Sequence, residues 1–144
     1  MSVEANKTAV PGLTWITPTV AIGGLHDAER AAQIGCAILS LVALPKGITL
    51  PPETDHLQIE LIDGAGNGVV KVRQAIGFLT DFMRDGEKVF VHCHAGRSRS
   101  VVILAMALMQ HLGVSRGAAL AMIQKHREIA LTPGIEGMFK LVWA

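Results

Sequence analysis

The chain has 144 residues, of which half are hydrophobic and 17% are charged, and this composition excludes an intrinsically disordered segment. Its 13 basic and 12 acidic residues leave a net charge of +1, which excludes a general electrostatic attraction to nucleic acid or to an anionic membrane. The length suits one compact domain over residues 1–144, with residues 1–12 as a flexible leader.

The start of the chain carries Glu4 and Lys7 and has no apolar stretch of signal-peptide length. The longest apolar run, residues 101–109, is about half the length that a bilayer-spanning helix needs. The two cysteines, Cys36 and Cys93, are fewer than a disulfide-stabilised secreted domain uses. These features predict a soluble, cytoplasmic protein without a membrane span.

Strands and helices are predicted to alternate along the chain. Hydrophobic periodicity and the positions of proline and glycine predict strands at residues 16–24, 36–44, 56–62 and 88–93. The same signals predict helices at residues 27–35, 69–84, 98–111, 116–127 and 133–144. Asp27 and Ser115 are expected to cap the first and fourth of these helices. This alternation predicts an α/β fold with a central, mostly parallel β-sheet flanked by helices.

The stretch VHCHAGRSRS, residues 91–100, lies between a predicted strand and the most hydrophobic predicted helix. Ligands of α/β folds bind where the carboxyl end of a strand passes into a helix. A loop at a helix N-terminus directs free N–H groups and the helix dipole toward one point. Gly96 permits a tight loop, and Arg99 can hold two phosphate oxygens at once. The sequence therefore predicts a phosphate-binding loop between a strand and a buried helix.

The same loop is expected to activate Cys93. Helix N-termini and nearby cations lower the pKa of a cysteine thiol, and the resulting thiolate, facing a bound phosphate, can attack the phosphorus in line. One structural alternative is a capped helix with an inert core cysteine. A metal site is not expected, because the adjacent side chains of Cys93 and His94 diverge and no second ligand pair at zinc spacing follows.

Cleavage of a phosphomonoester also needs an acid for the leaving oxygen, which contributes about 10²- to 10⁴-fold. Among the five aspartates, Asp63 ends a predicted strand and opens the glycine-rich loop at 63–68. Asp63 is therefore the first candidate for the acid, with a simple turn residue as its alternative role. Asp55, in the proline-rich loop before the same strand, is the second candidate.

Residues 92–100 resemble the H-C-x-x-G-x-x-R-[ST] signature of the cysteine-based protein phosphatases, especially the small dual-specificity branch. The resemblance extends from Ile16 to Leu141, although only the loop motif is specific. It implies catalysis without a metal or other cofactor, with Cys93 as the nucleophile and Arg99 as the phosphate clamp. It also places the acid about thirty residues before the nucleophile, which agrees with Asp63.

Further roles follow from the resemblance alone. The phosphate site is implied to be lined by His94, Ala95, Gly96, Arg97 and Ser98, with His94 and Arg97 at its rim. Ser100 is implied to hydrogen-bond the Cys93 sulfur and to assist breakdown of the intermediate, and His92 to orient the loop. Arg127 occupies the place of a family arginine and is implied to contact a second acidic group of the substrate, with a solvated residue at a helix end as the alternative.

The implied reaction is hydrolysis of phosphotyrosine, and also of phosphoserine and phosphothreonine, through a phosphocysteine intermediate. A phosphorylated protein or a small phosphomonoester is the expected partner, and nucleic acid is not expected. Phosphoinositides, sugar phosphates and RNA 5′-phosphates stay open as substrates, as do a rhodanese-like sulfurtransferase and a non-catalytic phosphoprotein-binding module. Cys36 is expected to be an inert core residue, with a redox partnership with Cys93 as the alternative. The oligomeric state is left open.

Overall fold

Five short strands form one sheet. The computed structural model describes residues 12–143, so nearly all of the predicted leader lies outside the described residues. The strands are β1 Thr14–Trp15, β2 Val20–Gly23, β3 Ala37–Ser40, β4 His56–Gln58 and β5 Val89–His92. Their order is β1-β2-β5-β3-β4, with β1 antiparallel to β2 and all other neighbours parallel. The predicted mostly parallel sheet is confirmed.

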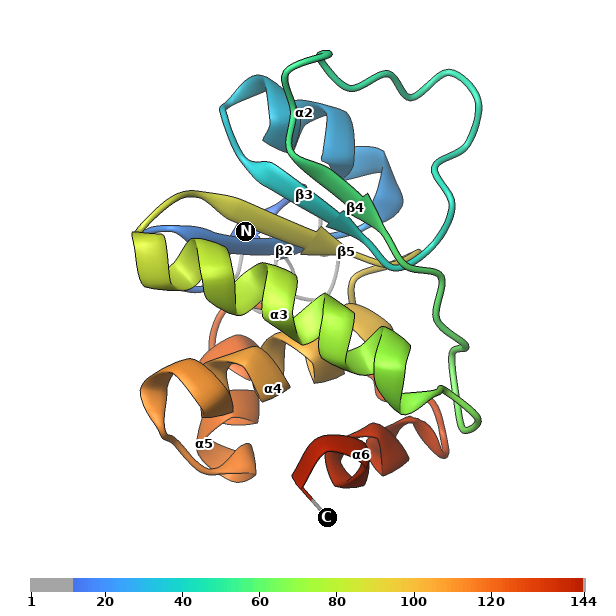
Figure 1. Ribbon diagram of the computed structural model, residues 1–144, viewed down its shortest axis with the longest axis vertical. Coiled ribbons are helices and arrows are strands. Elements are labelled where there is room, and N and C mark those ends of the chain that lie inside the picture. The colour runs from blue at the N-terminus through green and yellow to red at the C-terminus, as the bar shows by residue number, and fades with distance from the viewer. Residues whose placement is uncertain (1–11, 144) are drawn as a thin grey trace, which may run out of the picture.

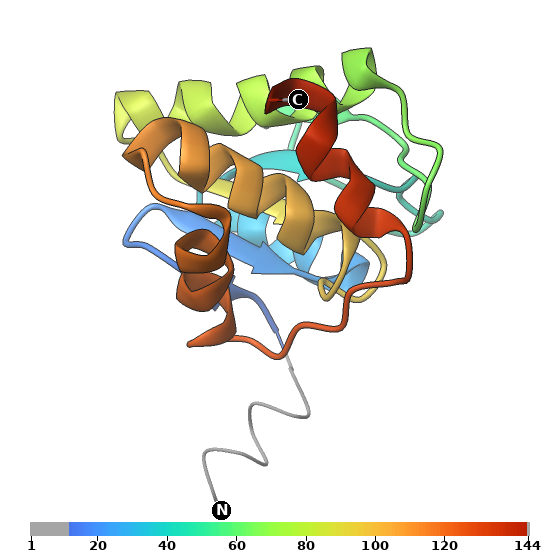
Figure 2. The ribbon, with the colours of Figure 1, turned by 90° about the horizontal axis from the view of Figure 1, so that it is seen from below.

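Helices cover both faces of this sheet (Figure 1). The 3-10 helix η1, Leu25–Asp27, and helix α2, Ala28–Gln33, lie on one face. The other face carries α3 Val69–Asp85, α4 Arg99–Leu112, α5 Arg116–Gln124, the 3-10 helix η2 Ile135–Met138 and α6 Phe139–Trp143. Figure 2 shows α4 between α3 and α5, and it packs against both. Within residues 12–143, no helix combines the length and the apolar character needed to cross a bilayer.

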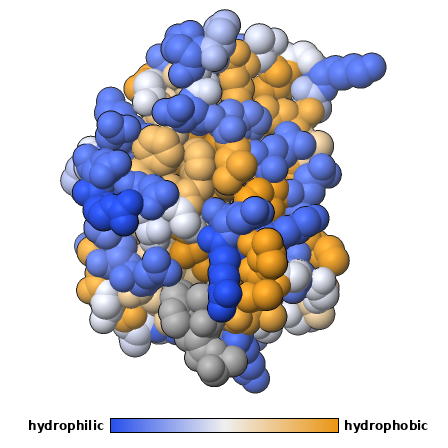
Figure 3. All heavy atoms as spheres, in the orientation of Figure 1, coloured by the Kyte–Doolittle hydropathy of each residue, from blue (hydrophilic) through white to orange (hydrophobic). Residues whose placement is uncertain are grey.

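The larger core surrounds α4. Every residue of this helix from Ser100 to Leu108 is buried, which is the pattern of a helix enclosed on all sides. On the opposite face of the sheet, three alanines of α2 pack with Ile38 and Phe90 in a smaller core. On the surface of the molecule, by contrast, polar and apolar side chains are interspersed over the face shown in Figure 3. The β5–α4 connection thus leads directly into this larger core.

Three predicted strands, at 16–24, 36–44 and 56–62, are markedly shorter in the structure, and the first of them begins four residues later, at Val20. β3 and β4 each end four residues earlier than predicted, at 40 against 44 and at 58 against 62. The two segments nevertheless stay side by side, because Leu61 N donates to Leu41 O at 3.0 Å. Apolar content alone does not show where the regular pairing of a strand stops. The predicted helix 116–127 is also shorter and ends at Gln124.

Asp27 does not cap α2, contrary to the prediction. Its side chain makes no capping hydrogen bond to that helix, and instead Asp27 Oδ2 accepts from Gly24 N at 2.9 Å. The residue therefore closes the η1 turn that precedes α2. Ser115 does cap α5, as predicted, because its hydroxyl accepts from Ala118 N at 3.1 Å.

Candidate active site

The loop from Cys93 to Ser98 connects the last residue of β5 to the first residue of α4. β5 lies between β2 and β3 and runs parallel to both, so three carboxyl ends meet at this edge of the sheet. The loop thus has the position that the fold class reserves for ligands. Cys93 is buried, whereas His94 and Ala95 are exposed at the rim.

All six carbonyl groups of the loop accept hydrogen bonds that point away from its centre. The donors are His92 Nδ1 to Cys93 O (3.0 Å), Leu25 N to His94 O (3.0 Å), Arg127 Nη2 to Ala95 O (3.0 Å), Arg127 Nε to Gly96 O (2.8 Å), Ala130 N to Arg97 O (2.9 Å) and Val102 N to Ser98 O (3.0 Å). A trans peptide directs its N–H opposite to its C=O, and the described residues contain no cis bond. The N–H groups of the loop therefore face its centre, where they form a concave ring of donors suited to an oxyanion.

The thiol at the base of this ring is acidified. Cys93 Sγ lies 3.2 Å from Ser100 Oγ. Burial by itself would raise the pKa of the Cys93 thiol, but hydrogen bonds from the Ser100 hydroxyl and from the N–H groups of Ser100 and Gly96, together with the charge of Arg99, lower that pKa below its ordinary value. The geometry therefore favours the thiolate, the nucleophilic form of cysteine.

Gly96 is required by the packing of the loop. Its backbone adopts φ +71°, and a Cβ at this position would lie 2.6 Å from the carbonyl carbon of Gly23 and 2.8 Å from Arg127 Nη2. No side chain fits there without movement of the backbone. The absence of a Cβ lets Gly23, the last residue of β2, and the guanidinium of Arg127 approach the phosphate-binding loop.

Arg99 links the loop to the segment that carries Asp63. Arg99 Nη1 donates to Leu61 O at 3.2 Å. Its Nε is buried and has no hydrogen-bond partner among the described residues. A buried donor without a partner is costly unless a ligand satisfies it. The unpartnered Nε of Arg99 is therefore a donor available to an anion, and the clamp role predicted from the sequence stays a prediction.

Asp63 lies two residues beyond Leu61 and is exposed. The turn around it is shaped by Asn67, whose Oδ1 accepts from Ile62 N at 2.7 Å and whose Nδ2 donates to Ile62 O at 2.9 Å and to Gly64 O at 3.3 Å. The structure therefore brings the Asp63 segment to the same edge of the sheet as Arg99, with the carboxyl group open to solvent.

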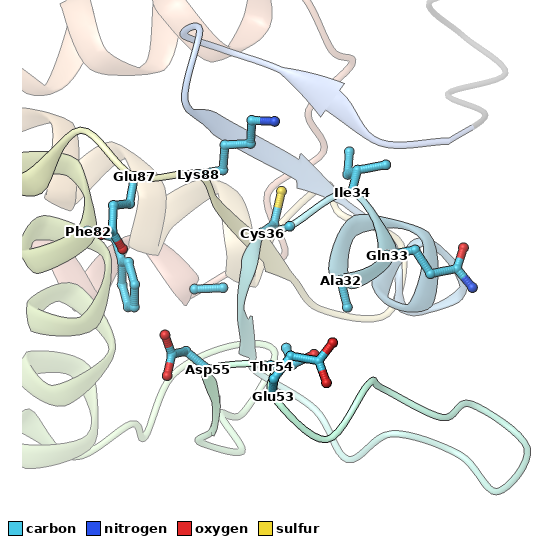
Figure 4. A pocket seen from close by; sticks show the side chains of 12 residues that line it. Ala32, Gln33, Ile34, Cys36, Glu53, Thr54, Asp55, Phe82, Glu87 and Lys88 are labelled. Atoms are coloured by element: carbon cyan, nitrogen blue, oxygen red, sulfur yellow. The ribbon is translucent and has the colours of Figure 1, made fainter.

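Asp55 lies at the opposite edge of the sheet. It immediately precedes β4, and Cys36 immediately precedes β3, so both lie at the amino ends of parallel strands. They line one pocket of about 470 Å³, together with Glu53, Glu87 and Lys88 (Figure 4). The second candidate for the acid is therefore remote from the loop.

The same geometry excludes a disulfide between Cys36 and Cys93. Ala37 N donates to Lys88 O, which places Cys36 beside Lys88. Lys88 precedes Cys93 by five residues, so the two cysteines are separated by roughly 16 Å along the strand direction. A disulfide needs Cα atoms closer than about 7 Å. Burial raises the pKa of the Cys36 thiol, as expected for an unreactive core residue.

Arg127 supports the loop, and the predicted contact with a substrate is wrong. The side chain is only 2% exposed. Besides the two loop carbonyls, it donates to Thr14 Oγ1 at 2.8 Å and to Gly12 O at 3.2 Å. A guanidinium whose donors are used in this way has no face left for a second acidic group. Arg127 ties the loop to the first described residues of the chain.

Several contributors to the site were not found from the sequence. Thr132 N donates to Ser98 Oγ at 3.0 Å, and Ser40 Oγ lies 2.6 Å from His92 Nε2. Ser40 could have been noticed as the one hydroxyl side chain inside the apolar run at 36–44. Within residues 12–143, no group of three histidine, cysteine, aspartate or glutamate side chains could hold a metal ion.

Comparison with known proteins agrees with this geometry. The family model described as "Dual specificity phosphatase, catalytic domain" matches residues 49–143, which is about two thirds of the chain. The chain belongs to the dual specificity phosphatase family. The matched segment includes the loop at 93–98, Arg99 and the Asp63 turn.

Individual relatives of this dual specificity phosphatase domain are distant. Human dual specificity phosphatase 28 is 24% identical over 83% of this chain and 70% of its own length. Its crystal structure superposes with a TM-score of 0.75 at 23% identity, over 90% of this chain and 91% of that one. Tyrosine-protein phosphatase vhp-1 of Caenorhabditis elegans is 24% identical over 91% of this chain, which spans only 21% of that protein. PTPMT1, solved in complex with PI(5)P, has a TM-score of 0.74 at 21% identity, over 89% and 92% of the two chains.

Proposed function

We propose that the protein hydrolyses phosphomonoesters through a phosphocysteine intermediate. The observation that carries this proposal is the ring of inward N–H groups around a thiol of lowered pKa. Such a ring matches the equatorial oxygens of a phosphoryl group in transfer. Membership of the dual specificity phosphatase family supports the same reaction.

In the first step, the Cys93 thiolate attacks phosphorus as the bond from phosphorus to the leaving oxygen breaks. The loop amides and the Arg99 guanidinium hold the three non-bridging oxygens. The carboxyl group of Asp63 gives its proton to the leaving oxygen, so that a neutral alcohol or phenol departs and Asp63 remains as a carboxylate. The product on the protein is phosphocysteine.

In the second step, water attacks the phosphorus and the S–P bond breaks. The Asp63 carboxylate takes a proton from this water, and inorganic phosphate leaves. Ser100, whose hydroxyl lies 3.2 Å from Cys93 Sγ, stabilises the departing thiolate by donating a hydrogen bond. His94, Ala95, Gly96, Arg97 and Ser98 act in both steps through their backbone N–H groups.

The proposed substrates are phosphorylated proteins, with phosphotyrosine and then phosphoserine and phosphothreonine as the target residues. The names of the relatives, a tyrosine-protein phosphatase and a dual specificity phosphatase, support this choice. A phosphoinositide is the second candidate, because PTPMT1 is solved with PI(5)P. The loop argues against a phosphoinositide, because lipid-directed members of the family usually carry lysines there and residues 94–98 contain none. We propose a cytoplasmic location, since both cysteines are free thiols.

The substitution Cys93→Ser tests the reaction. We expect it to lower turnover of p-nitrophenyl phosphate by at least about 10⁴-fold, because the reaction loses its nucleophile. Cys36→Ala, which removes the other thiol, is the matched control and should keep normal turnover. Acid quenching of the wild type during turnover should trap phosphocysteine at Cys93. Undiminished activity of Cys93→Ser, or formation of thiocyanate from thiosulfate and cyanide, would contradict the proposal.

A further inference from the structure

Three side chains on adjacent strands form a hydrogen-bonded chain that ends at the phosphate-binding loop. Ser40 Oγ on β3 lies 2.8 Å from His56 Nε2 on β4 and 2.6 Å from His92 Nε2 on β5. His92 Nδ1 in turn lies 3.0 Å from Cys93 O. Figure 1 shows β3 between β4 and β5. Ser40 and His92 are completely buried, whereas His56 is exposed.

The direction of every proton in this chain follows from its chemistry. A carbonyl oxygen only accepts, so His92 Nδ1 carries the proton that it donates to Cys93 O. Burial lowers the pKa of His92 to about 4, so the ring is neutral at pH 7 and its Nε2 is an acceptor. The hydroxyl proton of Ser40 must then be donated to His92 Nε2. Because Ser40 has no second proton, His56 Nε2–H donates to Ser40 Oγ.

We propose that Ser40 and His56 are positioning residues for the nucleophile Cys93. They hold His92 in the one tautomer that can donate to the carbonyl of Cys93, and that bond turns the first peptide of the loop outward. The inference rests on the proposed function only in taking Cys93 as the nucleophile. It adds an exposed residue on the edge strand to the machinery that shapes the site.

The surroundings of His92 support a fixed, neutral ring. Its ring stacks on Phe90 with centroids 5.8 Å apart and planes 20° apart. The charges that act on it come from His56 on β4, which lowers its pKa, and from Asp27 on η1, which raises it. Without Ser40, the buried Nε2 would have lost its donor, and the other tautomer, which cannot bond to Cys93 O, would become accessible.

His56→Leu and His56→Gln form the matched pair that tests the proposal. The side chain is exposed, so both variants should fold. Leucine removes the donor to Ser40, whereas the glutamine amide can still donate but cannot titrate. Gln58→Leu, on the same strand and also exposed, controls for an added apolar side chain. Ser40→Ala removes the central link.

Three readouts apply to each variant. Imidazole ¹⁵N chemical shifts report the tautomer of His92. The pH dependence of iodoacetamide labelling at Cys93, resolved by peptide mass, reports the ionisation of the thiol. Turnover of p-nitrophenyl phosphate gives kcat. We expect His56→Leu to mix the His92 tautomers, to shift the labelling profile and to lower kcat about fivefold, the loss expected for one net hydrogen bond. Ser40→Ala should do so more strongly, and His56→Gln and Gln58→Leu should match the wild type.

Two results would overturn the proposal. One is a His56→Leu variant with unchanged tautomer and labelling profile. The other is a His56→Gln variant that loses as much as His56→Leu. Tautomer and labelling changes in a protein that turns over no phosphomonoester would count against the proposed function and leave the positioning role intact.

Discussion

Residues 92 and 93 are adjacent and both buried, and burial disfavours the charged form of each, but only for Cys93 do other interactions outweigh this effect. For Cys93, donors from Ser100 and Gly96 outweigh the cost of burying a thiolate, and its pKa falls. For His92, the carbonyl that accepts from its ring does not compensate for burial, and its pKa falls to about 4. At neutral pH the imidazole of His92 is therefore neutral, while the lowered pKa of Cys93 favours its thiolate form. The histidine contributes geometry rather than charge.

The lowered pKa of His92 makes folding sensitive to acid. The unfolded chain takes up a proton at this ring near pH 6.5, whereas the folded chain does so only near pH 4. The unfolded state thus binds more protons between these values, and the free energy of unfolding decreases as the pH is lowered from 6.5 to 4. His92 alone should lower the free energy of unfolding by about 3 kcal/mol over this range. Urea unfolding at several pH values measures the effect.

His92→Asn is the comparison that isolates this contribution, because an asparagine amide can donate to Cys93 O but does not titrate. Between pH 6.5 and 4, the slope of its unfolding free energy against pH should be smaller than that of the wild type by the contribution of about one bound proton. Equal pH slopes for the two proteins would show that His92 is not the responsible group.

At the scale of elements, the loop between β5 and α4 is held from three sides. The segment at 23–25 approaches it through Leu25 N, the segment at 127–132 through Arg127 and Ala130, and β5 through His92. Each contact uses a loop carbonyl, and each therefore turns an N–H inward. Elements far apart in the chain thus determine the anion-binding geometry together.

Gly96→Ala is predicted to disrupt this arrangement. The substitution forces a Cβ into a left-handed backbone and against Gly23 and Arg127, which should cost about 3 kcal/mol or more. Gly77→Ala is the matched control, since nothing lies within 4 Å of its new Cβ in α3. It should stabilise the protein by about 0.5–1 kcal/mol. Thermal unfolding of both variants checks the prediction, and similar Tm changes would refute it.

At the scale of the whole molecule, the parallel sheet separates two sets of acidic groups. The carboxyl ends of β2, β5 and β3 surround Cys93, and the chain beyond β4 brings Asp63 to that edge. The amino ends carry the pocket lined by Cys36 and Asp55 (Figure 4). Strand direction alone therefore separates two aspartates that are eight positions apart in the sequence.

Asp63→Asn and Asp55→Asn should consequently differ in activity. Loss of the acid at position 63 should lower kcat for phenyl phosphate by about 10²- to 10³-fold, because phenoxide is a poor leaving group. Asp55→Asn should stay within about twofold of the wild type, since the residue lies at the other edge. Steady-state kinetics of both variants decide the question, and a comparable loss in Asp55→Asn would contradict the assignment.

Much of the site is local in the sequence and could be predicted from it. Cys93, Gly96 and Arg99 stand within seven residues between a strand and a helix, so their spacing reports their geometry directly. The alternation of apolar runs likewise predicted the α/β class and the buried α4. The ends of β3 and β4 could not be predicted, because they depend on where pairing with a neighbouring strand stops.

The sequence by itself thus determined the fold class and the loop chemistry, since both depend on neighbours along the chain. Only the tertiary structure decided that Arg127 is buried under the loop, that Asp55 is remote from it, and that Ser40 lies between two histidines. These three results depend on strand order and strand direction. Ser40 bonds to histidines 16 and 52 positions away, and Arg127 bonds to Gly96, 31 positions away. Such contacts are made by packing, and no local pattern records them.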